Sequence, residues 1–445
     1  MRYGYFTFLS VALIFLSIVS GPAFSGPEAS AEDRGVPGWQ IEDQHNRMLM
    51  EKIAKTLDEK RGELIELYRD LHRNPEVSGR EERTAKVVAE RLRNLGLEVE
   101  TGIGGHGVVG ILKGGKPGPV VAYRADMDAV YSKDPDPVSF KSETPGVRHI
   151  CGHDLHVTVA LGIAEALAPI REDFPGTVKF IFQPSEENAQ GAKAMIADGV
   201  LEKPAPEAIL AVHCAPLEVG QIGSVEGMLL PGLDVIQVTI DGEGDLKKAA
   251  DAVAGVIASV STVSFADIQK MEFGPSSVEE LVQNDFIFAV VVSSEKNPEK
   301  NQWILRAMAR TSSEENSAAA KKNIEAGIGK LDLPDITTKM EYSDSVLPPV
   351  MNDRELVRGA MDTIRSAHGD QSLVVIDQVP PFFGEDFAFY LEKIPGVMYW
   401  LGVSNAKKGI IGLPHHPRFA VDEEAIFVGA KTMAAVLLNY LETIR

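Results

Sequence analysis

The chain has 445 residues, of which 44% are hydrophobic and 24% are charged, so it suits a large folded protein of two or three domains. A disordered or fibrous chain is excluded by the same composition. Its 64 acidic residues outnumber the 44 basic ones, and the net charge of -20 argues against a nucleic-acid-binding surface or an anionic membrane face. We therefore expect no nucleic-acid partner.

The first residues have the pattern of a secretory signal peptide. Arg2 precedes an apolar run over residues 6–19, which is shorter than the roughly 20 residues of a membrane span. Small residues suited to cleavage end at Ser25 or at Ala31, and the sequence does not choose between them. A retained anchor is the alternative, and no later segment is expected to reach transmembrane length. We predict a signal peptide over residues 1–25 and an exported protein, periplasmic or secreted, without stable membrane insertion.

The patterns that follow predict an α/β domain. Apolar residues at spacings of three, four and seven predict helix from residue 41 onward, and a second helix over 81–95 ends at Gly96, a good C-terminal cap. The glycine-rich stretch 102–107 is expected to be a turn. Short apolar runs predict strands at 108–112, 120–123, 178–182 and 209–213, with a helix at 157–167. Strands that alternate with helices imply a mostly parallel central sheet flanked by helices.

A second module is predicted to interrupt this domain. Its elements, in chain order, are strand 234–240, helix 246–261, strands 286–292 and 303–308, helix 314–328 and strand 336–342. The order βαββαβ is that of a ferredoxin-like fold. Helices at 354–367 and 423–441 then return to α/β character. We expect a discontinuous α/β domain in two parts, 40–229 and 344–445, around this inserted module over 230–343.

The segment RHICGHDLH, residues 148–156, places a thiol, three histidines and a carboxylate in nine positions. Residues two apart face the same side of an extended stretch, so Cys151 and His153 are expected to converge on one ion. A polar loop whose histidines are buried in the core is the alternative for this segment taken alone.

A second segment, QPSEENAQGA, follows the strand predicted at 178–182. Its adjacent carboxylates point in different directions, so Glu187 can bind a metal while Glu186 contacts a water molecule bound to that metal. Two like charges this close also raise one pKa, which suits a general base near neutral pH. A solvated acidic turn is the alternative, although ligand sites in α/β sheets form at such strand ends.

Three weaker signals come later in the chain. His213 ends a predicted strand beside Cys214, the sequence GEDF covers residues 384–387, and LPHHPRF carries His415 and His416. Each of these fits an ordinary core or surface residue when taken alone. With the earlier segments they supply Cys, His, Glu, His and His, enough for two divalent ions that share a bridging water.

The ordered motifs YRADMDAV, CGHDLH, QPSEEN, VHCAP, GEDF and HHPRF resemble the two-domain metal-dependent amidohydrolases and carboxypeptidases related to aminoacylase. The nearest branch contains hippurate hydrolase, N-acyl-amino-acid amidohydrolases and the indoleacetyl-amino-acid hydrolases of plants. LHRNPEVSGRE, residues 71–81, is similar to the N-terminal helix region of that family. The resemblance covers roughly residues 63–441 and implies cleavage of an amide bond in an N-acyl amino acid or a small peptide.

The resemblance also implies a metal site and a base. Cys151 would be a thiolate shared by two divalent metal ions, and the remaining ligands would be His153, Glu187, His213 and His415. Glu186 would be the general base that takes a proton from the bridging water and delivers it to the leaving amine. The ions would be Mn, Zn, Co or Ni, because thiolate and imidazole suit Zn while carboxylate and water tolerate the others.

Further residues receive supporting roles by resemblance. Asp126 and Asp128 would orient ligating side chains, and Asp154 would line the same neighbourhood. Arg310 would contact a substrate carboxylate, with a helix-capping arginine as the alternative. The two-part domain would be the catalytic domain, and the inserted module would be a satellite domain that mediates homodimer formation through a sheet edge.

The chain departs from the family pattern at two positions, a histidine and the asparagine of an Asn-Val-Ile-Pro-like motif, in place of which this sequence has NQWILRAMAR. Relatives carry a histidine early in the satellite domain that helps to hold the oxyanion, whereas this sequence goes straight from Gly244 to Asp245. Loss of one such donor typically costs about 100- to 1000-fold in rate. An amidohydrolase with altered substrate recognition, a peptidase or deacylase with another oxyanion donor, and a metal-binding protein with little catalysis therefore all stay open.

Cysteine placement argues against a disulfide, since Cys151 and Cys214 both flank proposed metal ligands and a bridge would remove the shared thiolate. We expect bound metal to protect Cys151 from thiol reagents.

Overall fold

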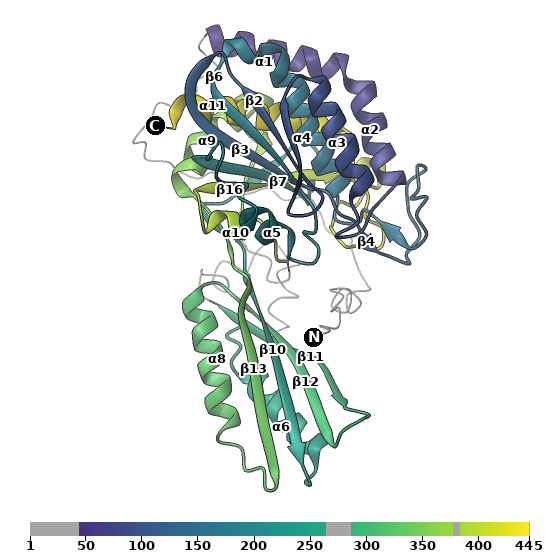
Figure 1. The fold of residues 1–445 in the computed structure, drawn as a ribbon, viewed down its shortest axis with the longest axis vertical. Coiled ribbons are helices and arrows are strands. Elements are labelled where there is room, and N and C mark those ends of the chain that lie inside the picture. Colours follow the sequence, from purple (N-terminus) through teal and green to yellow (C-terminus); the bar gives the residue numbers. More distant parts are fainter. Residues whose placement is uncertain (1–43, 264–285, 377–382, 445) are drawn as a thin grey trace. The chain divides into compact units, whose positions relative to one another are not determined.

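The computed structural model describes residues 44–263, 286–376 and 383–444 (Figure 1). The predicted signal peptide lies outside these residues. The described chain divides into two compact units. The larger contains residues 44–227, 352–376 and 389–444, and the smaller contains 228–263, 286–351 and 383–388.

The larger unit is built on an eight-stranded sheet in the order β1-β2-β6-β3-β7-β16-β8-β15. The four central strands, β6, β3, β7 and β16, run parallel to one another, whereas β1 and β2 extend one edge antiparallel. The strands are β1 (Glu98–Ile103), β2 (Gly107–Lys113), β3 (Lys116–Asp126), β6 (Pro175–Gln183), β7 (Ala208–Glu218), β8 (Ile222–Ser224), β15 (Leu373–Val375) and β16 (Gly396–Ser404). The mostly parallel α/β sheet is therefore confirmed, and residues 104–106 form the predicted turn.

Helices flank this sheet (Figure 1). They are α1 (Gln44–Glu59), α2 (Arg61–Arg73), α3 (Glu82–Asn94), α4 (His153–Leu167), α5 (Gly191–Ala197), α9 (Arg354–His368), α10 (Ala388–Leu391) and α11 (Glu424–Thr443). Every residue of α4 is buried, and α4 packs against α1, α2 and α11. The single helix expected from residue 41 onward is interrupted at Lys60, which lets the apolar faces of both α1 and α2 pack on α4.

Helix α11 corrects one expectation. Its 20 residues are long and apolar enough to cross a membrane, although no later segment was expected to reach that length. However, 89% of its apolar window is buried inside the protein. Helix α11 packs on α4, α9 and β3, so it is a core helix of the α/β unit.

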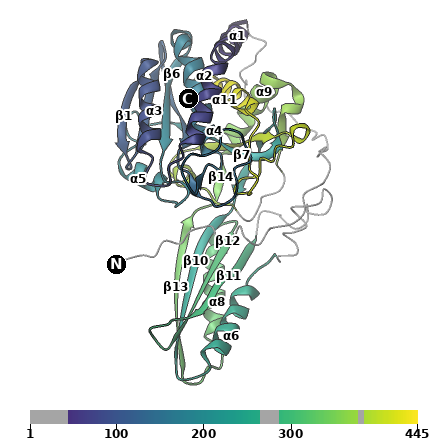
Figure 2. The ribbon, with the colours of Figure 1, turned by 90° about the vertical axis from the view of Figure 1, so that its right-hand side faces the viewer.

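The smaller unit confirms the predicted βαββαβ order. Its elements are β10 (Gly232–Gly242), α6 (Leu246–Ser259), β11 (Ile287–Lys296), β12 (Gln302–Thr311), α8 (Glu314–Ile328) and β13 (Ile336–Leu347). The sheet is antiparallel with the order β11-β12-β10-β13, and α6 and α8 cover one face (Figure 2). Asp245 and Ser313 cap the two helices by accepting hydrogen bonds from Lys248 N and Asn316 N.

Candidate metal centre

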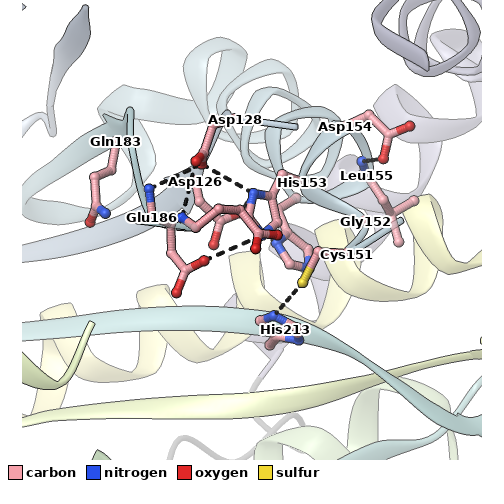
Figure 3. Close-up of polar contacts among 12 residues, drawn as sticks. Asp126, Asp128, Cys151, Gly152, His153, Asp154, Leu155, Gln183, Glu186 and His213 are labelled. Atoms are coloured by element: carbon pink, nitrogen blue, oxygen red, sulfur yellow. Dashed lines mark hydrogen bonds and ion pairs between the residues drawn. The ribbon is translucent and has the colours of Figure 1, made fainter. Parts of the chain in front are cut away.

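The sequence-predicted ligands gather at the carboxyl edge of the parallel strands (Figure 3). Asp126 is the last residue of β3, and Glu186 and Glu187 follow the end of β6. His213 lies inside β7, which continues to Glu218 and does not end at the histidine as expected. Parallel strands end at one edge of a sheet, which is where ligand sites form in this fold class.

Two sets of donor atoms share the thiol of Cys151. In the first set, Cys151, His153 and His213 offer ligand atoms within 4.8 Å of one another, and Cys151 Sγ lies 3.4 Å from His213 Nε2. In the second set, Cys151, Glu187 and His415 meet the same limit, with His415 Nε2 3.5 Å from Glu187 Oε1. The buried thiol of Cys151 therefore belongs to both triads of donors.

Cys151 and His153 converge for a different reason from the one predicted. His153 is the first residue of α4, and Gly152 adopts a left-handed conformation with φ 89°, so a tight turn replaces the expected extended stretch. A Cβ atom at position 152 would lie 2.5 Å from Cys214 Sγ. Glycine is therefore required here both by its backbone conformation and by its neighbour.

Substitution of Gly152 by alanine should destabilise the protein. Left-handed backbone costs a non-glycine residue about 1–2 kcal/mol, and overlap with Cys214 adds to this. We expect denaturant unfolding of the metal-free protein to show a lower midpoint. Gly62→Ala is the matched control, because nothing lies within 4 Å of that Cβ in helix α2. Equal midpoints for the two variants would refute the packing argument.

Hydrogen bonds fix two histidine rings near the centre. His156 Nε2 accepts a bond from Cys214 N at 2.9 Å, so His156 Nδ1 is the atom that donates to Asp126 Oδ1 at 2.6 Å. His213 Nδ1 lies 2.9 Å from the Cys214 carbonyl, which can only accept. The remaining nitrogen of His213, Nε2, faces Cys151 and is the one suited to a metal.

The three supporting aspartates have different partners. Asp128 accepts hydrogen bonds from the backbone N–H groups of Glu186 and Glu187, at 3.1 and 3.0 Å, and lies 3.3 Å from His153 Nδ1. Asp126 Oδ1 lies 3.8 Å from the same ring nitrogen. Asp154 instead contacts His72 of α2, with 2.6 Å between Oδ2 and Nδ1. Asp126 and Asp128 therefore face the proposed ligands, and Asp154 ties α4 to α2.

Burial and the density of acids perturb the proton affinities of the donors. Burial raises the pKa of Cys151 well above its ordinary value. Burial also raises the pKa of Glu187 to about 8, against the opposing effect of His153. Burial alone would lower the pKa of His153, but Asp126 and Asp128 outweigh it and raise that pKa to about 10. A divalent cation would take the place of these protons.

The donor set fits a metal. His153 Nε2 and Glu187 Oε1 are buried without a hydrogen-bond partner in the described part of the chain. Buried polar atoms are normally paired, so such a cluster of donor atoms suits a bound cation. Thiol, imidazole and carboxylate groups are the ligands of zinc and of neighbouring divalent metals. Both cysteines are buried and free.

Two site residues were missed by the sequence analysis. Ser78 Oγ donates to Asp128 Oδ2 at 2.6 Å, and Glu81 Oε1 accepts from Ser185 N at 2.8 Å. Both lie in the segment LHRNPEVSGRE, which was attributed to a helix region. The structure has no helix over residues 74–81, and this segment instead reaches the loop after β6. The polar residues of NPEVSGRE were the available signal.

Arg310 lies in the smaller unit, on β12, and is not part of a helix cap. Its side chain is buried, and burial lowers its pKa to about 10.

An α/β sheet with buried thiol, imidazole and carboxylate groups at its carboxyl edge, joined to a βαββαβ unit, is typical of two-domain metal-dependent hydrolases. The profile of peptidase family M20/M25/M40 matches residues 122–439. The chain belongs to this family and is a hydrolase of it, as the motifs predicted.

Curated relatives and a solved structure agree with this assignment. An N-acetylcysteine deacetylase of Bacillus subtilis is 32% identical over 392 residues, covering 86% of this chain and 98% of the relative. An IAA-amino acid hydrolase of Arabidopsis thaliana is 32% identical over 385 residues, covering 85% of this chain and 80% of the relative. The crystal structure of the Bacillus subtilis YXEP protein, described as a dinuclear metal-binding peptidase of the M20 family, has a TM-score of 0.70 at 30% identity and covers 86% of this chain and 99% of its own.

Proposed function

We propose that this protein hydrolyses the amide bond of N-acyl amino acids or short peptides, with two divalent metal ions as cofactors. The observation that carries the proposal is the pair of donor triads sharing Cys151, with Glu186 beside them. His153 and His213 would complete one ion's ligands, and Glu187 and His415 those of the other. When bound, the ions would polarise the substrate carbonyl and lower the pKa of a shared water.

Glu186 is the proposed general base. Its side chain is 9% exposed, and its Oε2 lies 3.9 Å from His153 Nε2. It would take the proton of the attacking water and return it to the nitrogen of the leaving amine, which balances the hydrolysis. Asp128 holds the backbone of Glu186 and Glu187 and so keeps base and ligand in fixed relation. Arg310 is our proposed contact for the substrate carboxylate.

The substrate class rests on the relatives. The names of two relatives, an N-acetylcysteine deacetylase and an IAA-amino acid hydrolase, describe enzymes that remove an acyl group from an amino acid. Binding of a small molecule follows from membership of the family. Export and assembly into a homodimer through an edge of the four-stranded sheet, at β11 or β13, remain our proposals from the sequence.

A substrate screen tests the proposal. Release of free amino acid would be measured for a panel of N-acyl amino acids and dipeptides, with Mn(II), Zn(II), Co(II) or Ni(II) added. We expect turnover of at least one N-acyl amino acid that requires metal. Turnover of dipeptides alone would favour the peptidase alternative. Tight binding of two metal equivalents without any turnover would favour a metal-binding protein and contradict the proposal.

Removal of metal should make Cys151 more reactive toward thiol reagents. We expect a thiol reagent to modify Cys151 at least about 10-fold faster after chelation, because metal ligation withdraws the thiolate lone pairs. At a free metal concentration of 100 times the dissociation constant, metal binding stabilises the fold by about 2.7 kcal/mol, and chelation should remove this stabilisation. Cys214, 2% exposed, is the internal control and should react slowly in both states. Peptide mass mapping of the labelled protein measures both rates, and equal labelling of Cys151 with and without metal would contradict the assignment.

A further inference from the structure

Three consecutive backbone N–H groups after β6 are held by two buried carboxylates. Ser185 N donates to Glu81 Oε1 at 2.8 Å, and the next two residues, Glu186 and Glu187, donate to Asp128. Glu186 and Glu187 are the proposed base and a proposed ligand. The direction of both side chains therefore depends on what holds this short stretch of backbone.

The backbone of residues 185–189 contains two strained positions. Ser185 has φ 60° and Ala189 has φ 57°, both in the left-handed region that favours glycine. Non-glycine residues in this region are strained and persist only where their surroundings hold them. The hydrogen bond to Glu81 stabilises this conformation at Ser185. A second hydrogen bond, from Gly191 N to Ser185 O at 3.0 Å, closes the loop.

Glu81 is well placed to act as a fixed support. Its side chain is 0% exposed, and Oε1 also accepts a hydrogen bond from Gly79 N at 3.0 Å. Ser78, three residues before Glu81, donates to Asp128. The same short segment therefore supplies the Glu81 carboxylate and holds the Asp128 carboxylate. The segment is itself anchored by a hydrogen bond from Ala129 N to Glu76 O at 2.8 Å.

We infer that Glu81 is a positioning residue for the hydrolysis, acting through Ser185 to aim the carboxylate of Glu186. This inference rests on the proposed function. Glu81 bonds to the backbone of Ser185 and not to a proposed ligand side chain, so its loss should disturb the base more than the metal. The predicted signature is a fall in kcat with metal content preserved.

The primary variant is Glu81→Ala, assayed on the best substrate of the screen. We expect kcat to fall at least about 10-fold while KM stays within about threefold, because misaligned catalytic groups lose rate steeply. Two equivalents of bound metal and an unchanged visible spectrum of the Co(II) protein should accompany the loss. Glu81→Asp, which keeps the carboxyl group and shortens the side chain, should lose kcat similarly and is the variant to assay if the alanine variant does not fold.

Glu81→Gln is the rescue variant. Its carboxamide oxygen can still accept from Ser185 N, so kcat should stay within about threefold of wild type. Asp353→Ala controls for stability: the Asp353 carboxylate caps α9, away from this segment, by accepting from Leu356 N. Loss of that cap should lower the melting temperature and leave kcat near wild type.

The outcomes separate this inference from the function on which it rests. Wild-type kcat in Glu81→Ala, or a loss that only follows lost metal, would overturn the positioning role alone, provided that Glu186→Gln is inactive in the same assay. Full turnover by Glu186→Gln would overturn the base assignment and the role of Glu81 together.

Discussion

Glu186→Gln should lower kcat by about 10²- to 10⁴-fold, the range that a positioned general base contributes. The carboxamide cannot take the proton of the attacking water, whereas its shape and hydrogen-bonding atoms resemble those of the carboxylate. Bound metal should stay at the wild-type stoichiometry, because neither donor triad that shares Cys151 includes Glu186. Steady-state kinetics and metal analysis of one preparation measure both quantities.

Glu207→Gln is the matched control for this change. Glu207 is an exposed glutamate of the same unit, just before β7, and its backbone N bonds to Val120 O. Its loss of charge should leave kcat unaltered. Retained turnover by Glu186→Gln would show that another group is the base, and loss of metal from that variant would show that Glu186 is a ligand.

Replacement of Cys151 by alanine should have the largest effect on metal content. Both donor triads contain this thiol, so its removal leaves two donors in each. We expect fewer than one tightly bound equivalent where the wild type binds two. The loss of Lewis-acid assistance, worth several kcal/mol, should reduce kcat/KM by about 100-fold or more.

The second cysteine gives a close control for Cys151. Cys214 is buried and free like Cys151, but its Sγ packs beside Gly152 and belongs to neither triad. Cys214→Ala should cost about 1 kcal/mol or less in stability, through a small cavity, and should keep both metal equivalents. Metal loss from both variants would indicate a general packing defect. Two bound equivalents in Cys151→Ala would refute the shared thiolate.

Much of the architecture could be predicted because local pattern and tertiary fold agree. In the smaller unit, buried apolar residues of β10 alternate with half-buried residues, and α8 has the predicted bounds, Glu314–Ile328. Here amphipathic periods and capping residues alone indicate the elements. The ligand types were likewise readable from motifs, since Cys, His and Glu at strand ends suggest metal chemistry.

Local geometry could not be predicted where tertiary contacts decide it. Helix α4 starts one turn earlier than expected, because His153, Asp154 and His156 are polar yet buried in the helix. The turn at Gly152 depends on its approach to Cys214, which is 62 residues away. Residues 74–81 have no periodic apolar pattern, and their role comes from bonds to Asp128 and Ser185, distant in sequence.

The most direct test of the shared-thiolate centre is anomalous diffraction at the metal absorption edge from crystals of the zinc-loaded protein. The account predicts two peaks in the larger unit, each about 2.3 Å from Cys151 Sγ. His153 and His213 should contact one peak, and Glu187 and His415 the other. A single peak, or two peaks of which either lies beyond bonding distance of Cys151, would contradict it.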